Sequence, residues 1–224
     1  MLTNILEVPS QKRNHMSEHL AALFNKYECD KASKHKYHTV YGPELEHLRL
    51  SAYPINILEV GVFKGASTAA WLEYFPHATI YCLDIFTRAD PKYIPVLKDP
   101  RVKWLKGDST KLDVITSIKE AWPRIRFDVI IDDGLHTPRA NASTLGNLFG
   151  LLKTSGIYFI EDVWALDQMT NKQLSHDWIQ NHSSDLNLLE NQQFLNVLAD
   201  KTVTRFDLRE ETKHADSYII KVTK

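Results

Sequence analysis

Cysteine is scarce in this 224-residue sequence, which contains only Cys29 and Cys82, and charges of the two signs nearly cancel at a formal net charge of −1. So few cysteines exclude a disulfide-dense secreted scaffold and indicate free thiols in a reducing compartment. The balanced charge gives no broad basic face of the kind that binds nucleic acid. We therefore expect no nucleic-acid partner.

Long apolar runs are absent as well. No run approaches the length that spans a membrane, and residues 1–20 lack the basic start and unbroken apolar stretch of a signal peptide. With 43% hydrophobic residues, the chain can still bury one large core. These features predict a globular cytoplasmic protein without a membrane partner.

The centre of the sequence alternates short apolar runs with segments of helical periodicity. Strands are predicted at 55–61, 78–86, 102–108, 127–134 and 156–162. Helices are predicted at 67–75, 112–122 and 139–153, the last ending at the Ser155–Gly156 break. Alternation at this spacing is typical of a mostly parallel sheet with helices on both faces. The expected fold class is therefore α/β.

The two ends of the sequence differ from this centre. Helical spacing occurs in a polar N-terminal arm, at residues 16–26 and 44–53. We divide the chain where this arm gives way to the sheet, into a helical arm at 1–50 and a main domain at 51–224. At the other end, two strand-like runs with a short polar link predict an antiparallel hairpin, at 202–211 and 215–224.

A glycine turn follows the first predicted strand, in the stretch LEVGVFKGAST. Gly61 and Gly65 leave the backbone open to a ligand, in the crevice where sheets of this kind bind ligands. The spacing differs from the dinucleotide fingerprint G-x-G-x-x-G, and a plain strand-to-helix turn would give the same pattern. Asp84 ends the second strand, where an acid can hold both ribose hydroxyls, and Asp108 ends the third, near where an adenine would lie.

Two later strands each end in a pair of acids. Asp132 and Asp133 follow the fourth strand, and Glu161 and Asp162 follow the fifth. If these strands are neighbours, their carboxylates converge and repel one another unless a proton or a cation intervenes. Hard oxygen ligands favour Mg²⁺, and His136 is close enough in sequence to act as general base on a hydroxyl held there. Simpler explanations stay open: turn chemistry, a helix cap and a solvated histidine.

The order of these motifs resembles the class I S-adenosylmethionine-dependent methyltransferases, from about residue 55 to the C-terminus. The resemblance implies a Rossmann-like, seven-stranded, mostly parallel sheet with helices on both faces and a C-terminal antiparallel hairpin. It also implies that Glu59 and Gly61 lie near the methionine part of S-adenosyl-L-methionine, and that Asp132 lies towards the cofactor. A dinucleotide oxidoreductase stays open, because the first half of that fold looks alike in sequence.

Three segments narrow the resemblance to the metal-dependent sugar O-methyltransferases of macrolide and related antibiotic pathways. The segments are IDDGLH, IEDVW and, upstream, DKASKHKYHTVYGPEL. In that group the upstream segment folds over the cofactor as a lid, so the arm at 1–50 is expected to supply a lid. The resemblance further implies a cytoplasmic enzyme with a small-molecule substrate, assembled as a homo-oligomer.

The same resemblance implies roles for individual side chains. The implied Mg²⁺ ligands are Asp133, Glu161 and Asp162, and the implied catalytic residues are His136 and Asp133. The implied cofactor-binding residues are Lys31, Tyr37, Glu59, Gly61, Ser67, Asp84, Asp108, Ser109 and Asp132.

The function expected from these residues is methyl transfer from S-adenosyl-L-methionine to a hydroxyl, of a sugar or glycoside, that Mg²⁺ chelates. The segment 164–178 is expected to form one wall of the acceptor site. One alternative is a metal-dependent methyltransferase of a catechol or other phenol, for which Trp104, Trp122 and Trp164 are candidate walls. Two others are an oxygenase-like or hydrolytic enzyme that uses the same acids to hold Fe²⁺ or Mn²⁺, and a non-catalytic cofactor-binding subunit.

Overall fold

The computed structural model describes residues 10–163 and 184–224, which build a mixed sheet of seven strands in the order β3-β2-β1-β4-β5-β7-β6. The first five strands in sequence pair in parallel, and β7 pairs antiparallel with both β5 and β6. The predicted α/β class and C-terminal hairpin are confirmed. The strands are β1 (Ile55–Val60), β2 (Ala78–Asp84), β3 (Val102–Lys106), β4 (Phe127–Asp132), β5 (Leu152–Ile160), β6 (Thr202–Asp207) and β7 (Tyr218–Thr223).

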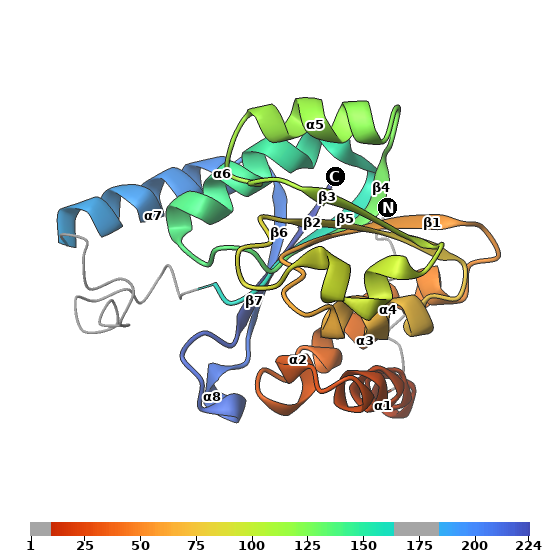
Figure 1. Cartoon of the computed structure of the whole chain (residues 1–224). Coiled ribbons are helices and arrows are strands. Elements are labelled where there is room, and N and C mark those ends of the chain that lie inside the picture. The colour runs from red at the N-terminus through yellow and green to blue at the C-terminus, as the bar shows by residue number, and fades with distance from the viewer. Residues whose placement is uncertain (1–9, 164–183) are drawn as a thin grey trace, which may run out of the picture.

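Helices cover both faces of the sheet, which Figure 1 shows nearly edge-on. The helices are α1 (Ser10–Lys26), α2 (Asp30–Ser33), α3 (His38–Arg49), α4 (Ala66–Tyr74), α5 (Asp113–Ala121), α6 (Pro138–Leu148), α7 (Ser184–Leu198) and α8 (Arg209–Thr212), with short 3-10 turns η1 (Pro91–Tyr93), η2 (Pro95–Lys98) and η3 (Phe149–Leu151). One core lies between the sheet and α1, α3 and α4, and a second core lies between the sheet and α5, α6 and α7. The central parallel strands β1 and β4 are buried on both sides for this reason, whereas β3 at the edge of the sheet is mostly exposed.

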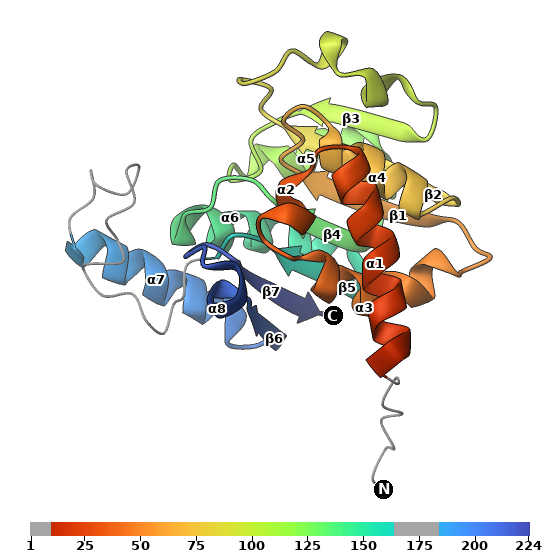
Figure 2. The ribbon, with the colours of Figure 1, turned by 90° about the horizontal axis from the view of Figure 1, so that it is seen from below.

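The N-terminal helices belong to the first of these cores. α1 lies across α3 and α4, as Figure 2 shows, and its Phe24 ring meets the Trp71 ring of α4 edge-on at 5.0 Å between centroids. Tyr41 of α3 lies between Trp71 of α4 and Phe159 of β5. Its ring centroid is 5.1 Å from that of Trp71 and 4.8 Å from that of Phe159. The described part of the predicted arm is therefore packed against the sheet.

Three predicted element boundaries were wrong. The helix expected at 139–153 ends at Leu148, and β5 already begins at Leu152, because the apolar run between them suits either element. The Ser155–Gly156 break lies inside β5, where Ser155 has a φ of 64° and the pairing with β4 is irregular. The helix expected at 44–53 is α3, which starts at His38 and ends at Arg49.

The C-terminal hairpin also differs from its prediction in one respect. Its first strand ends at Asp207, where the carboxylate accepts a hydrogen bond from the backbone N–H of Arg209 and pairs with the Arg209 guanidinium. The link to β7 is therefore longer than the predicted short polar link and contains the short helix α8.

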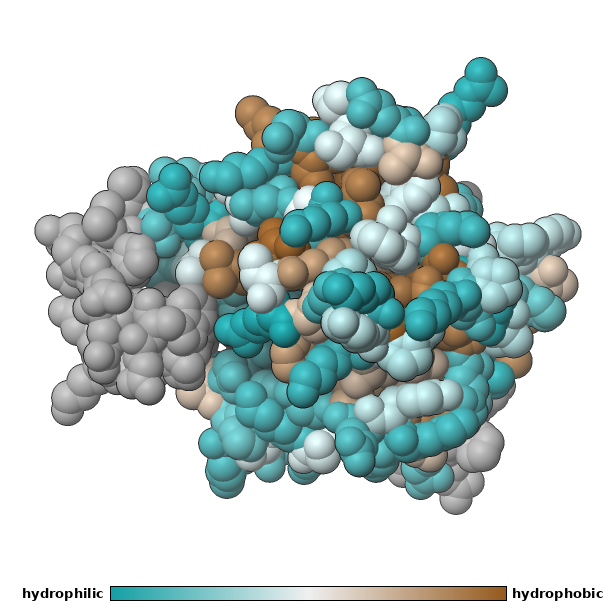
Figure 3. Space-filling view, viewed as in Figure 1, coloured by the Kyte–Doolittle hydropathy of each residue, from teal (hydrophilic) through white to brown (hydrophobic). Residues whose placement is uncertain are grey.

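Both cysteines are buried and free, as the sequence indicates. Among the described helices, none combines the length and apolar character that crossing a bilayer requires. On the face shown in Figure 3, apolar surface occurs as separate spots among hydrophilic side chains. The expected wall at 164–178 and Trp164 lie outside the described residues.

Gly61 is expected to be essential to the folded state. Its φ is 84°, and a Cβ there would lie 1.9 Å from the carbonyl oxygen of Asp133. Gly61→Ala should therefore lower the free energy of unfolding by about 2 kcal/mol or more, through left-handed strain and the steric overlap. Urea denaturation measures this change. Gly146→Ala, in the last turn of α6 with open space at the Cβ position, is the control and should raise stability by up to about 1 kcal/mol.

Candidate active site

The predicted acid pairs meet at one edge of the sheet because β4 and β5 are neighbours. Asp132 pairs in register with Ile160, and the N–H of Glu161 donates to the carbonyl of Asp132 at 2.9 Å. The residues that follow the two strands are thereby held side by side. The convergence expected from the sequence is confirmed.

Lys31 of α2 lies between two of these carboxylates. Its Nζ donates to Oδ2 of Asp133 at 2.6 Å and also to Oε2 of Glu161. The side chains of Lys31 and Glu161 are each 2% exposed, whereas that of Asp133 is 26% exposed. Burial lowers the pKa of Lys31, but the charges of Asp133 and Glu161 outweigh it and hold that pKa well above its usual value. The ammonium ion is thus the counter-charge of the acid cluster.

Two tyrosine hydroxyls bind the second acid pair. Tyr37 donates to Oδ1 of Asp162 at 2.6 Å and accepts from the Asp162 N–H at 3.1 Å. Tyr41 donates to Oε1 of Glu161. Burial, together with the neighbouring carboxylates, raises the pKa of both phenols well above its ordinary value, so they stay protonated donors. They fix the orientation of Glu161 and Asp162.

His136 faces the more exposed carboxylates. Its Nε2 lies 3.5 Å from Oδ1 of Asp133 and 3.8 Å from Oδ2 of Asp162. Within the described residues, ligand atoms of Asp133, His136 and Asp162 lie within 4.8 Å of one another, which is close enough to share one metal ion. Glu161 contributes no oxygen to this group, because Lys31 and Tyr41 hold its carboxylate.

A second group of possible ligands shares Asp162. His35, Asp162 and Asp216 also have ligand atoms within 4.8 Å, with Nδ1 of His35 3.6 Å from Oδ1 of Asp162. The same nitrogen lies 3.0 Å from the hydroxyl of Ser217. Neither Asp216 nor Ser217 was predicted from the sequence; the only signal was that these two polar residues directly precede a strand-like run, distant in sequence from the acid pairs.

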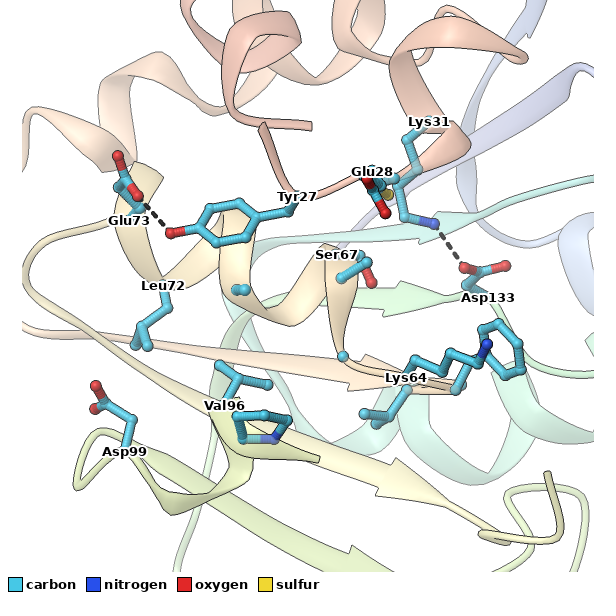
Figure 4. A pocket seen from close by; sticks show the side chains of 18 of the residues that line it. Tyr27, Glu28, Lys31, Lys64, Ser67, Leu72, Glu73, Val96, Asp99 and Asp133 are labelled. Atoms are coloured by element: carbon cyan, nitrogen blue, oxygen red, sulfur yellow. Dashed lines mark hydrogen bonds and ion pairs between the residues drawn. The ribbon is translucent and has the colours of Figure 1, made fainter. Parts of the chain in front are cut away.

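A cleft of about 1220 Å³ opens beside this cluster, between the α1–α2 turn, α4 and η2. Figure 4 shows Lys31 and Asp133 at one end of it and Tyr27 and Glu73 at the other. Of the predicted site residues, the cleft is lined by Lys31, Gly61, Ser67 and Asp133. The lining does not include Tyr37, Glu59, Asp84, Asp108, Ser109 or Asp132.

Glu59 and Asp84 support the glycine turn from behind. Glu59 is fully buried, which raises its pKa, and it accepts a hydrogen bond from the Thr68 hydroxyl of α4. Asp84 accepts from the backbone N–H of Val62 at 2.7 Å and of Phe63 at 3.1 Å. Both acids thus hold the turn that forms the cleft wall.

Asp108 and Ser109 shape the loop after β3. Asp108 accepts from the N–H and the hydroxyl of Thr110, at 3.0 and 2.6 Å. The Ser109 hydroxyl lies 2.9 Å from that of Thr144 on α6. This loop is therefore anchored to the opposite layer of helices.

Asp132 lies under the cluster, 3% exposed, with the Tyr158 hydroxyl at 3.3 Å. Burial raises the pKa of Asp132 to about 7, against the opposing effect of His136. The candidate aromatic walls pack elsewhere: Trp104 against Phe86 and Trp122 against Tyr81. Neither tryptophan lines the cleft.

The stretch that carries the glycine turn and both acid pairs matches a protein family. Residues 58–163 fit the family model described as a methyltransferase domain. The match covers just under half of the 224 residues, so the finding is a similarity of this stretch to a methyltransferase domain. Lys31, Tyr37 and Tyr41 lie before the matched residues, although they bind its acids.

Curated relatives of the chain are named as O-methyltransferases, several of them of rhamnosyl or olivosyl compounds. The chain is 30% identical over 134 residues to the 8-demethyl-8-(2-methoxy-alpha-L-rhamnosyl)-tetracenomycin-C 3'-O-methyltransferase of Streptomyces olivaceus, a match that covers 56% of this chain and 32% of the relative. It is 30% identical over 118 residues to the mycinamicin VI 2''-O-methyltransferase of Micromonospora griseorubida, covering 50% of this chain and 28% of the relative. The matched part thus spans about a third of the length of these relatives.

Solved structures show the same fold. The MycE methyltransferase from the mycinamycin biosynthetic pathway, in complex with Mg, SAH and mycinamycin VI, superposes with a TM-score of 0.63 at 23% identity. That match covers 92% of this chain and 54% of the MycE chain. A putative caffeoyl-CoA O-methyltransferase from Staphylococcus aureus gives a TM-score of 0.51 at 14% identity, covering 76% of each chain. The Rossmann-like methyltransferase fold of this chain is therefore confirmed.

The Tyr41 hydroxyl is expected to stabilise the fold through Glu161. Tyr41→Phe removes a donor from a buried carboxylate and should lower the free energy of unfolding by about 1–3 kcal/mol in urea denaturation. Tyr53→Phe, at a side chain that is 79% exposed, is the control and should change stability little. Equal effects of the two variants would contradict the assigned role of Tyr41.

Proposed function

We propose that the chain is an S-adenosyl-L-methionine-dependent O-methyltransferase that acts on a hydroxyl of a sugar or glycoside, with Mg²⁺ at the strand-end acids. The observation that carries this proposal is the position of Asp133. It lines the cleft beside Gly61 and Ser67, and it also belongs to the group with His136 and Asp162 that can hold a metal ion. A cofactor in the cleft and a hydroxyl at the metal would therefore be adjacent.

The residues fit a hard divalent cation. Asp133 and Asp162 offer carboxylate oxygens with partly exposed side chains, so water or substrate oxygens can complete the coordination. A cation bound there would lower the pKa of a coordinated hydroxyl and orient it. We assign Asp133 and Asp162 as ligands. Glu161 becomes a third ligand when its contact with Lys31 is broken.

The residues also fit the cofactor. A Cβ on Gly61 would occupy the space against Asp133, so the turn stays open only with glycine. We assign Lys31, Gly61 and Ser67 to direct contact, since they line the cleft. The remaining predicted cofactor residues would shape the site without touching the cofactor. Glu59 and Asp84 would support the glycine turn, and Asp108 and Ser109 would hold the loop after β3. Asp132 would support the acid cluster from beneath, and Tyr37 would orient Asp162.

His136 is the residue that would take the proton of the acceptor hydroxyl. Asp133, 3.5 Å from its Nε2, would orient the ring. Bound S-adenosyl-L-methionine would supply the methyl group, and its sulfur would keep the electron pair of the broken sulfur–carbon bond as the hydroxyl oxygen bonds to the methyl carbon. Catalysis would then consist mainly of positioning and electrostatics.

A sugar or glycoside acceptor is favoured over a phenol. The relatives are named for O-methylation on rhamnosyl and olivosyl compounds. A small-molecule substrate is therefore expected, and the homo-oligomer implied by resemblance stays a prediction.

The first test is calorimetric titration with S-adenosyl-L-methionine, in Mg²⁺ and in EDTA. Binding in both buffers is expected, because Gly61 and Ser67 contribute to the cleft independently of the metal group. The absence of binding in both buffers would overturn the cofactor assignment. Turnover of glycosides with adjacent hydroxyls should then require Mg²⁺, since the cation holds the acceptor.

Loss of a metal ligand should abolish turnover but not cofactor binding. Asp133→Asn and Asp162→Asn are each expected to lower kcat by about 100-fold or more, while the Kd for S-adenosyl-L-methionine changes little. Asp113→Asn, at an exposed position in the first turn of α5, is the control. Full turnover of Asp133→Asn in metal-free buffer would remove the metal from the proposal.

His136→Ala should lower kcat by about 100-fold to 10,000-fold, with partial recovery at high pH. Recovery is expected because the acceptor hydroxyl then loses its proton to the solvent without a protein base. A pH–rate profile measures both effects, and His77→Ala, at an exposed histidine before β2, is the control. An unchanged rate would exclude His136 as the base.

A further inference from the structure

Lys31 occupies the place between two carboxylates that a metal ion would need. Its ammonium ion, which reaches them from α2, contacts Asp133 and Glu161 together. Figure 4 shows its contact with Asp133 at one end of the cleft. Both carboxylates carry negative charge that a divalent cation would compensate more strongly than a single ammonium ion. Lys31 and a metal ion would therefore compete for the same oxygens.

The burial of Glu161 supports the same conclusion. Its side chain is 2% exposed, against 26% for Asp133 and 16% for Asp162. One Glu161 oxygen is held by Lys31 and the other by Tyr41. Glu161 can therefore reach a metal ion at Asp133 only if Lys31 withdraws.

The cleft gives Lys31 a place to withdraw to. Lys31 lines this cleft, next to Glu28 and Asp30 of the same turn. α2 contains only four residues, Asp30–Ser33, so a rotation of the Lys31 side chain disturbs no long helix. An ammonium ion that leaves the acids would regain water in the open cleft, which limits the cost of displacement.

We propose that Lys31 is the resident counter-cation of the acid cluster, and that a divalent cation binds by displacing it from Asp133 and Glu161. Lys31 thus sets the affinity of the site for metal, and its release recruits Glu161 as the third ligand. This inference rests on the metal site of the proposed function, but it concerns metal affinity and the position of Lys31 and needs neither cofactor nor acceptor.

The position of Lys31 can be measured on the unaltered protein. Amine labelling by reductive methylation, read by mass spectrometry, should leave Lys31 protected without metal and reactive in saturating Mg²⁺. Lys119, an exposed lysine of α5 on the other face of the sheet, is the internal control and should react equally in both conditions. Continued protection of Lys31 at saturating Mg²⁺ would overturn the proposal.

Metal affinity gives the second measurement. Lys31→Met removes the competing charge at similar side-chain length, so it should tighten Mg²⁺ binding by at least about tenfold in calorimetry without cofactor. Lys31→Arg keeps the charge and should bind Mg²⁺ no more tightly than the parent protein. Lys64→Met, at an exposed lysine that lines the same cleft, should leave the affinity unchanged.

The outcomes separate this inference from the proposed function. Equal or weaker Mg²⁺ binding by folded Lys31→Met overturns the competition, whatever the methyltransferase activity. If Lys31→Met does not fold, the labelling result on the parent protein decides alone. No Mg²⁺ binding to the parent protein, with S-adenosyl-L-methionine still bound, would overturn the metal site itself.

Discussion

Compensation of buried negative charge at the ends of β4 and β5 is the constraint on which the site depends. The pairing of β4 with β5 brings together the four carboxylates of Asp132, Asp133, Glu161 and Asp162. Their proximity is set by the backbone, so a change of side-chain rotamer cannot separate them fully. Carboxylates in such proximity need protons, donors or cations. One lysine and two tyrosines supply this compensation in the described structure, and all three come from the segment that contains α2, α3 and the turn between them.

The same constraint explains how distant segments are joined. The turn between α2 and α3 contacts the acids on one side and the link before β7 on the other, through His35 with Ser217 and Tyr37 with the carbonyl of Asp216. Lys221 of β7 also pairs with Glu44 of α3 at 2.9 Å. The C-terminal hairpin of β6 and β7 thus holds in place the N-terminal segment whose side chains neutralise the acids at the ends of β4 and β5.

Much of this arrangement could be predicted from the sequence. Alternating apolar runs identify the strands, and acids at strand ends identify the edge where ligands bind, because both follow from local periodicity and parallel topology. The pairing of Lys31 with Glu161 could not be predicted, since it joins side chains 130 positions apart. The start of β5 at Leu152 was missed because the run from Phe149 to Leu152 suits a helix end and a strand start equally.

The boundary of the matched methyltransferase domain has a consequence for how the protein can be divided. Residues 58–163 contain the acid pairs but none of the side chains from α2 and α3 that neutralise them. A fragment cut to that boundary would keep Glu161 at the end of a central strand with no cation or hydroxyl from those helices beside it. The smallest autonomous folding unit of this chain is therefore larger than the domain that sequence similarity defines, and it must include the helices that precede the sheet.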